Sequence, residues 1–346
     1  MDQSPNDLTE ILAAWDLAAP RTAEIVSGHI NRTFRVEHAR GKLILQRVNP
    51  IFSPQVQEDI EAVTAHLAAR GVVTPRLVRT RAGGLFATAA DGGVWRMLTF
   101  IEGETLLVAD SPGRCREAGR LLGVWHRALW DLDHAFQSLR VGVHDTPRHL
   151  QNLEDALVRH STHPCLALVS GVAQEILSRA RAGDSIKALP ARAVHGDPKI
   201  SNVLFSPDGS ALCLLDLDTL SRLPLAFELG DAFRSWCSPG GEENERASFC
   251  LDFFEAGLGG YAGVLRDRPA PEETSAIPVL IHSIALELSA RFCEDALDEK
   301  YFRWDKARFP SACQHNLLRA RSQLALAASI ESQLPALERI NRSAWD

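Results

Sequence analysis

The segment from Ala193 to Asp218 constrains the fold more than any other part of this 346-residue chain. It contains two short β-type runs, VLF and ALCLLD, on either side of the turn sequence SPDG, and this pattern predicts a small hairpin. Helical patterns precede and follow the hairpin. We therefore expect a helical body around it, with the loop before the first strand close to the end of the second strand.

Four polar residues occupy these two places. Asp197 and Asn202 stand five residues apart in the loop, Lys199 lies between them, and Asp216 ends the second strand. Phosphoryl transfer needs a carboxylate at the acceptor hydroxyl, oxygen ligands for Mg²⁺ and a cation at the transferred group. Each residue alone is more often a turn or surface residue. Together they favour Asp197 as catalytic base, Asn202 and Asp216 as metal ligands, and Lys199 as the neutralising charge.

Three neighbouring residues are expected to support this loop. His195 precedes the proposed base and is expected to brace the loop by hydrogen bonds. Gly196 stands where regulated protein kinases carry Arg, so regulation by a phosphorylated loop is not expected. Asp231, early in a helix that follows the hairpin, is expected to accept backbone N–H bonds from the loop.

The first hundred residues contain mainly strand-type runs with one helix inserted. The runs are TFRVEH, KLILQRV, PRLVRT, GLFATA and VWRMLTFI. The inserted helix is predicted to be capped by Ser53, to begin at Pro54 and to end at Gly71. We predict an N-terminal lobe over residues 1–102.

The chain then becomes helical. Ser111 is predicted to cap a helix with Pro112 at its first position, and a long amphipathic helix covers residues 317–334. We predict a larger helical lobe over residues 103–346, and hence an α+β fold with two lobes.

The composition limits the partners. A formal net charge of −7 argues against a nucleic-acid ligand and favours a small molecule. The seven cysteines are scattered, which predicts neither a disulfide framework nor a zinc site. The first residues are a poor signal peptide, and the apolar stretch 276–288 carries polar residues that a membrane span tolerates badly. We expect a soluble, cytoplasmic protein without a membrane partner; the sequence leaves its oligomeric state open.

The central loop resembles the catalytic loop of the aminoglycoside phosphotransferase and choline kinase superfamily, and the whole chain resembles bacterial N-acetylhexosamine 1-kinases. The matching segments are SGHINRTFRV, LILQRVNPIF, WRMLTFIEGET, HGDPKISNVLF, CLLDLDT, ELGDAFRS, ARFCEDALDEKYF and HNLLRARSQLALAASIE. Of these motifs, LQRVN, LDLDT, RFCEDALDEKYF and HNLLRARSQ together are specific to the hexosamine kinase-like group. The resemblance implies a bilobal protein-kinase-like fold, ATP with Mg²⁺, an acceptor hydroxyl at the anomeric carbon of an N-acetylated sugar, and a role in carbohydrate metabolism.

In the first lobe, the strand that carries a phosphate-pairing Lys in other kinases reads LILQRVN. Gln46 occupies the expected place, and Arg47 should point to the opposite face of the strand. Which of the two meets the nucleotide is open, and its acidic partner on the helix would be Glu58 or Glu61. The turn GHINRT is expected to cover the phosphates and the start of the connector to meet the adenine, which adds the nucleotide-binding candidates Gly28, His29, Asn31, Thr33, Phe100 and Glu102.

A sugar pocket needs aromatic ring faces and planar charged groups. Arg234, Trp236, Arg291 and Tyr301 lie in the matching segments and are candidates for these contacts, against the alternatives of core packing or surface ion pairs. Asp218 is a candidate for contact with the sugar or the metal, or for a supporting role.

Three hypotheses follow. The first is a kinase that phosphorylates the anomeric hydroxyl of an N-acetylhexosamine, such as N-acetylglucosamine or N-acetylgalactosamine. The second keeps the chemistry and changes the acceptor to an aminoglycoside, choline, homoserine or a thiosugar. The third is a pseudokinase that binds without turnover, against which Asp197, Asn202 and Asp216 together argue.

Overall fold

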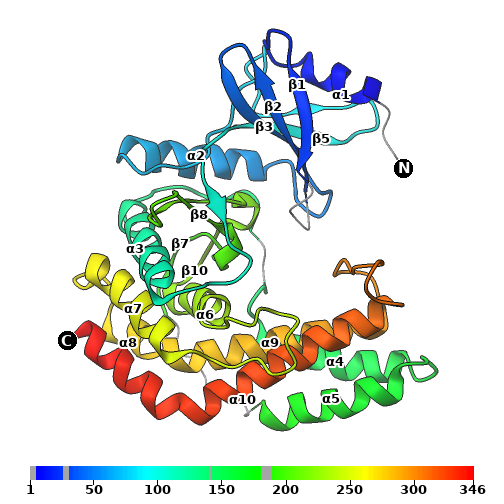
Figure 1. Cartoon of the computed structure of the whole chain (residues 1–346), viewed down its shortest axis with the longest axis vertical. Coiled ribbons are helices and arrows are strands. Elements are labelled where there is room, and N and C mark those ends of the chain that lie inside the picture. The colour runs from blue at the N-terminus through cyan, green and yellow to red at the C-terminus, as the bar shows by residue number, and fades with distance from the viewer. Residues whose placement is uncertain (1–4, 26–30, 140–141, 181–188) are drawn as a thin grey trace.

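A computed structural model describes residues 5–25, 31–139, 142–180 and 189–346. It shows a smaller part built on a β-sheet and a larger, mainly helical part, with helix α2 lying between the two (Figure 1). The predicted α+β class, with strands first and helices after them, is confirmed.

The first part is organised by a five-stranded sheet in the order β1-β2-β3-β5-β4, in which every neighbouring pair is antiparallel. Its elements are α1 (Pro5–Leu12), β1 (Arg21–Ile25), β2 (Arg32–His38), β3 (Gly41–Arg47), α2 (Val56–Ala69), β4 (Ala87–Thr88) and β5 (Val94–Thr99).

One face of this sheet forms a small core of its own. Phe34, Leu45 and Met97 stand opposite one another on β2, β3 and β5, so their side chains share a face. They pack with Trp15, whose indole N–H donates to the carbonyl of Val78 (2.8 Å). The opposite face is thereby left for α2 and the helical part of the molecule.

Helix α2 belongs to the larger core. Ile60 and Leu67 recur on its apolar face and join the cluster that contains Trp125 of the helical part. Asp59 is fully buried beside them and accepts hydrogen bonds from the side chain of His134 (2.7 Å) and from the backbone N–H of Gln137 (2.9 Å). The helix therefore attaches the sheet to the rest of the molecule.

One local prediction for this part was wrong, two were met only in part, and one was right. Ser53 does not cap α2, which begins at Val56, because residues 53–55 form a turn in which Ser53 Oγ accepts the backbone N–H of Gln55. The run PRLVRT forms only an isolated bridge, at Leu77, since part of its backbone hydrogen-bonds to a side chain instead of a strand. The run GLFATA shortens to β4. Gly71 (φ +74°) follows the end of α2 as predicted.

Over the residues that the structure describes, the second part contains eight α-helices, two 3₁₀ turns and five short strands. They are β6 (Glu104–Thr105), α3 (Pro112–Ala128), α4 (Thr146–Arg159), α5 (Leu166–Arg179), β7 (Ala191–Val194), the 3₁₀ turn η1 (Ile200–Asn202), β8 (Val203–Phe205), β9 (Ala211–Leu214), the 3₁₀ turn η2 (Leu217–Thr219), β10 (Ser221–Pro224), α6 (Leu225–Trp236), α7 (Leu251–Leu265), α8 (Pro271–Ser275), α9 (Ile277–Asp298) and α10 (Ala312–Trp345).

The helices of this part pack closely around the hairpin. Helix α3 is capped by Ser111, whose side chain accepts the N–H of Arg114, as predicted. It packs against α7 so closely that a Cβ on Gly119 would lie 1.9 Å from the carbonyl oxygen of Gly257. The long helices α9 and α10 pack along each other beneath α6 (Figure 1).

The predicted hairpin is confirmed as β8 and β9, which pair antiparallel. Strand β6 adds to β8, so the sheet of the helical part already includes residues 104–105. This pairing supports a boundary after residue 102, which remains a prediction. Among the residues that the structure describes, no helix is both long and apolar enough to cross a membrane.

Candidate active site

The loop between β7 and β8 carries three of the four predicted polar residues, and the fourth, Asp216, follows β9. Lys199 Nζ donates to Asp197 Oδ2 (2.7 Å). Asn202 Nδ2 donates to the backbone oxygen (2.9 Å) and to Oδ2 (3.2 Å) of Asp197. Asp197 keeps 23% of its side-chain surface exposed, so an acceptor can reach it. Asp216 follows β9 in the left-handed conformation (φ 60°), which turns the chain sharply at the end of the strand.

The charges of this cluster are unequally compensated. Burial alone would raise the pKa of Asp197, but the Lys199 ammonium holds it below its ordinary value, so the carboxylate stays ionised. Burial and the neighbouring Asp218 carboxylate raise the pKa of Asp216 to about 6. A raised pKa marks a carboxylate whose negative charge lacks compensation, and a divalent cation is a group that would supply it.

The loop is fixed from behind by two buried groups. His195 is fully buried; its Nε2 contacts the carbonyl oxygen of Leu215 (2.8 Å) and its Nδ1 accepts the N–H of Asp197 (3.3 Å). Glu228 accepts the backbone N–H groups of His195 (2.8 Å) and Gly196 (2.9 Å). The bracing role expected of His195 is therefore present in the structure.

The scaffold role expected of Asp231 belongs to Glu228 instead. Helix α6 begins at Leu225, so Glu228 lies in its first turn and faces the loop. Asp231 stands almost a turn further on and pairs with Arg234 (2.9 Å). The prediction chose the wrong acid of ELGD because the start of the helix is not marked by a side-chain cap.

Gly196 is required by geometry. Its φ is +82°, and a Cβ at this position would lie 2.1 Å from the carbonyl oxygen of Thr219. The side chain of Thr219 in turn donates to the carbonyl of His195 (2.9 Å). An Arg, as in regulated protein kinases, has no space here.

Two predicted acceptor contacts are instead parts of the scaffold. Trp236 is fully buried, and its indole N–H donates to the carbonyl of Pro198 (2.8 Å) directly beneath the loop. Arg234 is also buried, and its guanidinium pairs with Asp231 and with Glu242 (3.2 Å). The structure presents neither side chain at an open surface, so we no longer assign them to the acceptor.

The sheet contributes a row of three polar side chains opposite the loop. Thr33, Gln46 and Arg96 are direct partners on β2, β3 and β5, so they lie on one face. Gln46 Oε1 accepts from Nε (2.9 Å) and Nη2 (2.7 Å) of Arg96, and Gln46 Nε2 donates to Thr33 Oγ1 (3.2 Å). Gln46 carries no charge itself and serves to orient the Arg96 guanidinium.

Arg96 forms a fully buried ion pair with Asp218, through Nη1 to Oδ1 and through Nη2 to Oδ2 (2.8 Å). Asp218 also accepts from Asn31 Nδ2 (2.5 Å). Its side chain has no exposed surface, so the structure places it against the sheet and away from an acceptor. The pair connects β5 to the segment two residues beyond Asp216.

Helix α2 supplies Gln57 to this network, and neither Glu58 nor Glu61. Gln57 Oε1 accepts from Arg96 (3.4 Å), whereas Glu58 is exposed and Glu61 pairs with Arg79 (3.0 Å). Gln57 Nε2 is buried and has no hydrogen-bond partner among the described residues. A buried donor without a partner is costly, and an oxygen of a bound phosphate would satisfy it.

The remaining nucleotide candidates are spread over the sheet. Arg47 lies on the opposite face, as predicted, and pairs with Asp91 (2.6 Å). Glu102 is exposed and pairs with Lys42 (3.1 Å), whose ammonium also lies 5.3 Å from the ring centre of Phe100. Gly28 and His29 fall outside the described residues.

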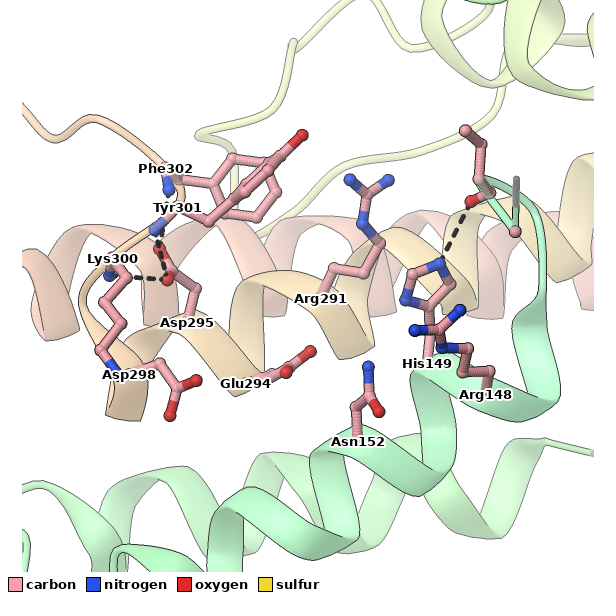
Figure 2. A pocket seen from close by; sticks show the side chains of 12 residues that line it. Arg148, His149, Asn152, Arg291, Glu294, Asp295, Asp298, Lys300, Tyr301 and Phe302 are labelled. Carbon is pink, nitrogen blue, oxygen red and sulfur yellow. Dashed lines mark hydrogen bonds between the residues drawn. The ribbon is translucent and has the colours of Figure 1, made fainter. Parts of the chain in front are cut away.

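Two further acceptor candidates meet in a separate cavity of about 400 Å³ between α4, α9 and the connector after α9 (Figure 2). Arg291 extends from α9 with its guanidinium 5.7 Å from the ring centre of Tyr301. Asp295 anchors the connector by accepting the N–H groups of Tyr301 (2.8 Å) and Phe302 (2.8 Å). The cavity is lined mainly by polar and charged side chains, namely Arg148, His149, Asn152, Arg291, Glu294, Asp295, Asp298 and Lys300.

Sequence reasoning missed Arg96, Gln57 and Glu228. The signal for Arg96 was present, because a charged residue inside the apolar run VWRMLTF is rarely buried without a partner. Gln57 and Glu228 had no such signal, since both stand in ordinary amphipathic helices.

The residues present fit a divalent cation with a nucleotide. Asn202 Nδ2 is used by Asp197, which leaves its amide oxygen as the ligand atom, and Asp216 offers a carboxylate. Oxygen donors of this kind suit Mg²⁺, which keeps waters and phosphate oxygens as its other ligands. Arg96 of β5 and the unpartnered amide donor of Gln57 on α2 lie on the opposite side of this candidate metal site, toward the sheet.

Comparisons with known proteins agree with this geometry. Residues 21–268 match the APH phosphotransferase enzyme family, so the chain belongs to that family. It is therefore a small-molecule kinase, a phosphotransferase with an alcohol group as acceptor.

A homoserine kinase of Methylobacterium radiotolerans is 27% identical over 81% of this chain and 82% of its own length. The solved aminoglycoside phosphotransferase of Alicyclobacillus acidocaldarius has a TM-score of 0.63 and 16% identity, and covers 97% of this chain and 98% of its own. Amicoumacin kinase hAmiN, solved in complex with AMP-PNP, Ca²⁺ and Ami, has a TM-score of 0.64 and 13% identity over 94% and 93%. These structures confirm the protein-kinase-like fold.

Proposed function

We propose that this protein is an ATP- and Mg²⁺-dependent kinase that phosphorylates the anomeric hydroxyl of an N-acetylhexosamine. The observation that carries the proposal is the ionised, partly exposed Asp197 held beside Lys199 and Asn202, together with the cavity of Arg291 and Tyr301. The sequence motifs that resemble N-acetylhexosamine 1-kinases support the choice of acceptor.

In this proposal, Asp197 accepts the proton of the acceptor hydroxyl and orients its oxygen toward the γ-phosphorus. Asn202 and Asp216 would hold Mg²⁺, which would neutralise charge on the phosphates. Lys199 keeps Asp197 ionised and adds positive charge at the transferred group. The geometry of the loop performs most of this work, since phosphoryl transfer depends mainly on positioning and charge.

The sheet supplies its cation from an unusual place. Gln46 stands where a Lys is expected, and Arg96 on the neighbouring strand provides the charge that Gln46 lacks. We propose that the Gln57 amide contacts a phosphate oxygen and that Arg96, whose donors are all used within the network, adds positive charge from behind it, while the turn that includes Asn31 covers the phosphates. The adenine then lies against the connector near residues 100–102, where we place the boundary between the two lobes.

The cavity offers the two kinds of contact that an N-acetylated sugar needs. The rings of Tyr301 and Phe302 provide apolar faces, and Arg291, 5.8 Å from the Phe302 ring centre, provides a planar donor for a hydroxyl or an acetamido oxygen. Tyr301 is 51% exposed, so its ring is open to a ligand. Figure 2 shows Arg291 and Tyr301 on the same side of α9.

Homoserine is the second candidate acceptor. Relatives at 24–28% identity are homoserine kinases. The cavity also carries both signs of charge, with Arg291 and Lys300 for a carboxylate, and Glu294 and Asp298 for an ammonium group. A zwitterionic amino acid fits such a lining on grounds of charge.

Steady-state assays with a panel of acceptors would separate these candidates. We expect turnover with N-acetylglucosamine or N-acetylgalactosamine, and a raised KM with little change in MgATP affinity for Arg291→Ala. Arg321→Ala is the matched control, because it removes an exposed ion pair on α10 with Glu245 (3.2 Å). Turnover of homoserine, choline or kanamycin but of no hexosamine would contradict the proposed acceptor.

The metal assignment has its own test. Asp216→Asn keeps the size of the side chain and removes its charge, so we expect Mg²⁺-dependent nucleotide affinity to fall by roughly tenfold or more, as for loss of residues that support metal sites. Isothermal titration with ATP at several Mg²⁺ concentrations measures this. An unchanged Mg²⁺ dependence would show that Asp216 is no ligand.

A further inference from the structure

The fold brings together three metal-binding side chains that lie far apart in the sequence. His163 and Cys165 stand in the turn between α4 and α5, and Cys313 lies in the first turn of α10. One ligand atom of each residue lies within 4.8 Å of the others. Tetrahedral sites with thiolate and imidazole ligands place the metal about 2.0–2.3 Å from each donor, so only a small closure is needed.

We propose that His163, Cys165 and Cys313 form a binding site for Zn²⁺ or a cation of similar softness. Two sulfur atoms and one imidazole nitrogen are soft ligands, which select such a cation over Mg²⁺. Three protein ligands leave a fourth position for water. The scattered spacing of the cysteines gave no hint of this site, because its ligands come from two distant segments.

The local backbone orders the first two ligands. His163 donates its N–H to the carbonyl of His160 (2.9 Å), and Leu166 donates to the carbonyl of His163 (3.0 Å), which closes two successive turns. The N–H of Cys165 contacts His163 Nδ1 (3.2 Å), so the imidazole is held beside the cysteine. The turn therefore presents both ligands from one hydrogen-bonded segment.

The third ligand is positioned independently. The N–H of Cys313 donates to Glu299 Oε1 (3.0 Å), which joins the start of α10 to the end of α9. Cys165 stands at the N-cap of α5 and Cys313 just inside α10, so the two thiols come from the starts of two different helices. Binding replaces the protons of the two thiols, which are released to solvent.

The site would join three helices behind the wall of the acceptor cavity. His160, in the same turn as His163, pairs with Asp298 (2.5 Å), which lines that cavity. A cation at Cys313 would thus tie the α4–α5 turn to the connector that carries Tyr301. This inference concerns metal binding and stability, and it holds whichever acceptor the enzyme uses.

The test uses the full-length protein, freed of metal with a chelator and kept reduced. Titration with Co²⁺ should produce thiolate-to-metal charge-transfer absorption that saturates at about one cation per chain, and Zn²⁺ should abolish it by displacement. Zn²⁺ should also raise the thermal unfolding midpoint. Cys165→Ser should weaken Co²⁺ binding by more than the roughly 10–100-fold that is typical when a residue hydrogen-bonded to a metal ligand is mutated.

Cys165→Ser should fold, because serine is a favoured N-cap residue. Cys250→Ser is the matched control, since Cys250 is also a partly exposed N-cap cysteine, at the start of α7. It should bind Co²⁺ as the unaltered protein does. Unchanged Co²⁺ affinity in Cys165→Ser, or absence of the absorption band from the reduced unaltered protein, would overturn the proposal. So would a Cys165–Cys313 disulfide in a protein that binds no metal after reduction.

Discussion

The two sides of the candidate active site are built in different ways. On the loop side, Asp197, Lys199, Asn202 and Asp216 lie within one short segment of sequence. On the sheet side, the network around Arg96 is assembled from β2, β3, β5 and α2. A site held in one loop keeps a spacing that can be recognised in sequence. A site assembled across strands depends on which residues the register places opposite one another.

The largest expected effect concerns the loop side. Asp197→Asn should lower kcat by about 100- to 10,000-fold, because the acceptor hydroxyl loses its base. MgATP affinity measured by titration calorimetry should change little. Asp208→Asn, in the exposed turn of the same hairpin, is the control and should keep its activity. Near-normal turnover of Asp197→Asn would show that Asp197 is not the catalytic base.

The sheet side depends on a buried ion pair. Arg96→Ala leaves the Asp218 carboxylate buried without its partner, which should cost about 3–5 kcal/mol of unfolding free energy in a urea titration. Arg47→Ala, on the opposite face of the sheet, should have little effect on stability or nucleotide affinity.

A double variant separates stability from function. Arg96→Met with Asp218→Leu replaces both charges by apolar side chains of similar size, so stability should largely return. Nucleotide affinity should stay low, because the sheet has lost its cation. Recovery of nucleotide affinity along with stability would mean that Arg96 serves only as a structural partner of Asp218. The network on the sheet side would then have no part in nucleotide binding.

Glu228 tests how the loop is held. Glu228→Gln places an NH₂ group against one of two backbone N–H groups, which should cost about 1–3 kcal/mol. Burial alone would raise the pKa of Glu228, but His126 holds it below its ordinary value. The stability it contributes is present above its unfolded-state pKa and is lost as pH falls through the lowered value. The variant should lose less stability on acidification, and an identical acid dependence would argue against this role.

The smallest effect is expected beneath the loop. Trp236→Phe keeps most of the packing and removes the hydrogen bond to the Pro198 carbonyl, at a cost of about 1 kcal/mol. Denaturant midpoints and kcat should both fall slightly. A loss of acceptor affinity with unchanged stability would restore Trp236 as an acceptor contact.

Much of the fold followed from local signals. The hairpin, the capped start of α3, the apolar face of α2 and the opposite direction of Arg47 were all predicted, because each depends on periodicity or on turn residues within a few positions. The strand expected at PRLVRT is reduced to one bridge to β5, because the N–H of Arg76 donates to the side chain of Thr99 and so interrupts the ladder.

The site was predictable only as far as its residues were neighbours in sequence. Trp236 and Arg234 were assigned to the acceptor because sequence does not show that both are buried. For Asp218 the sequence left contact with the sugar, contact with the metal and a supporting role open, because its partner Arg96 lies 122 residues away. Burial and long-range pairing are properties of the folded chain, and no local pattern encodes them.

Transfer of the γ-phosphoryl group of ATP to an acceptor hydroxyl can be observed directly by NMR of the products after incubation with ATP, Mg²⁺ and a mixture of N-acetylglucosamine, N-acetylgalactosamine and homoserine. We predict a new ³¹P resonance coupled to the anomeric proton of a sugar, absent with Asp197→Asn. A phosphate on the homoserine hydroxyl alone would contradict the proposed acceptor. If none of the tested acceptors becomes phosphorylated, that result would contradict phosphoryl transfer by this protein to any of them.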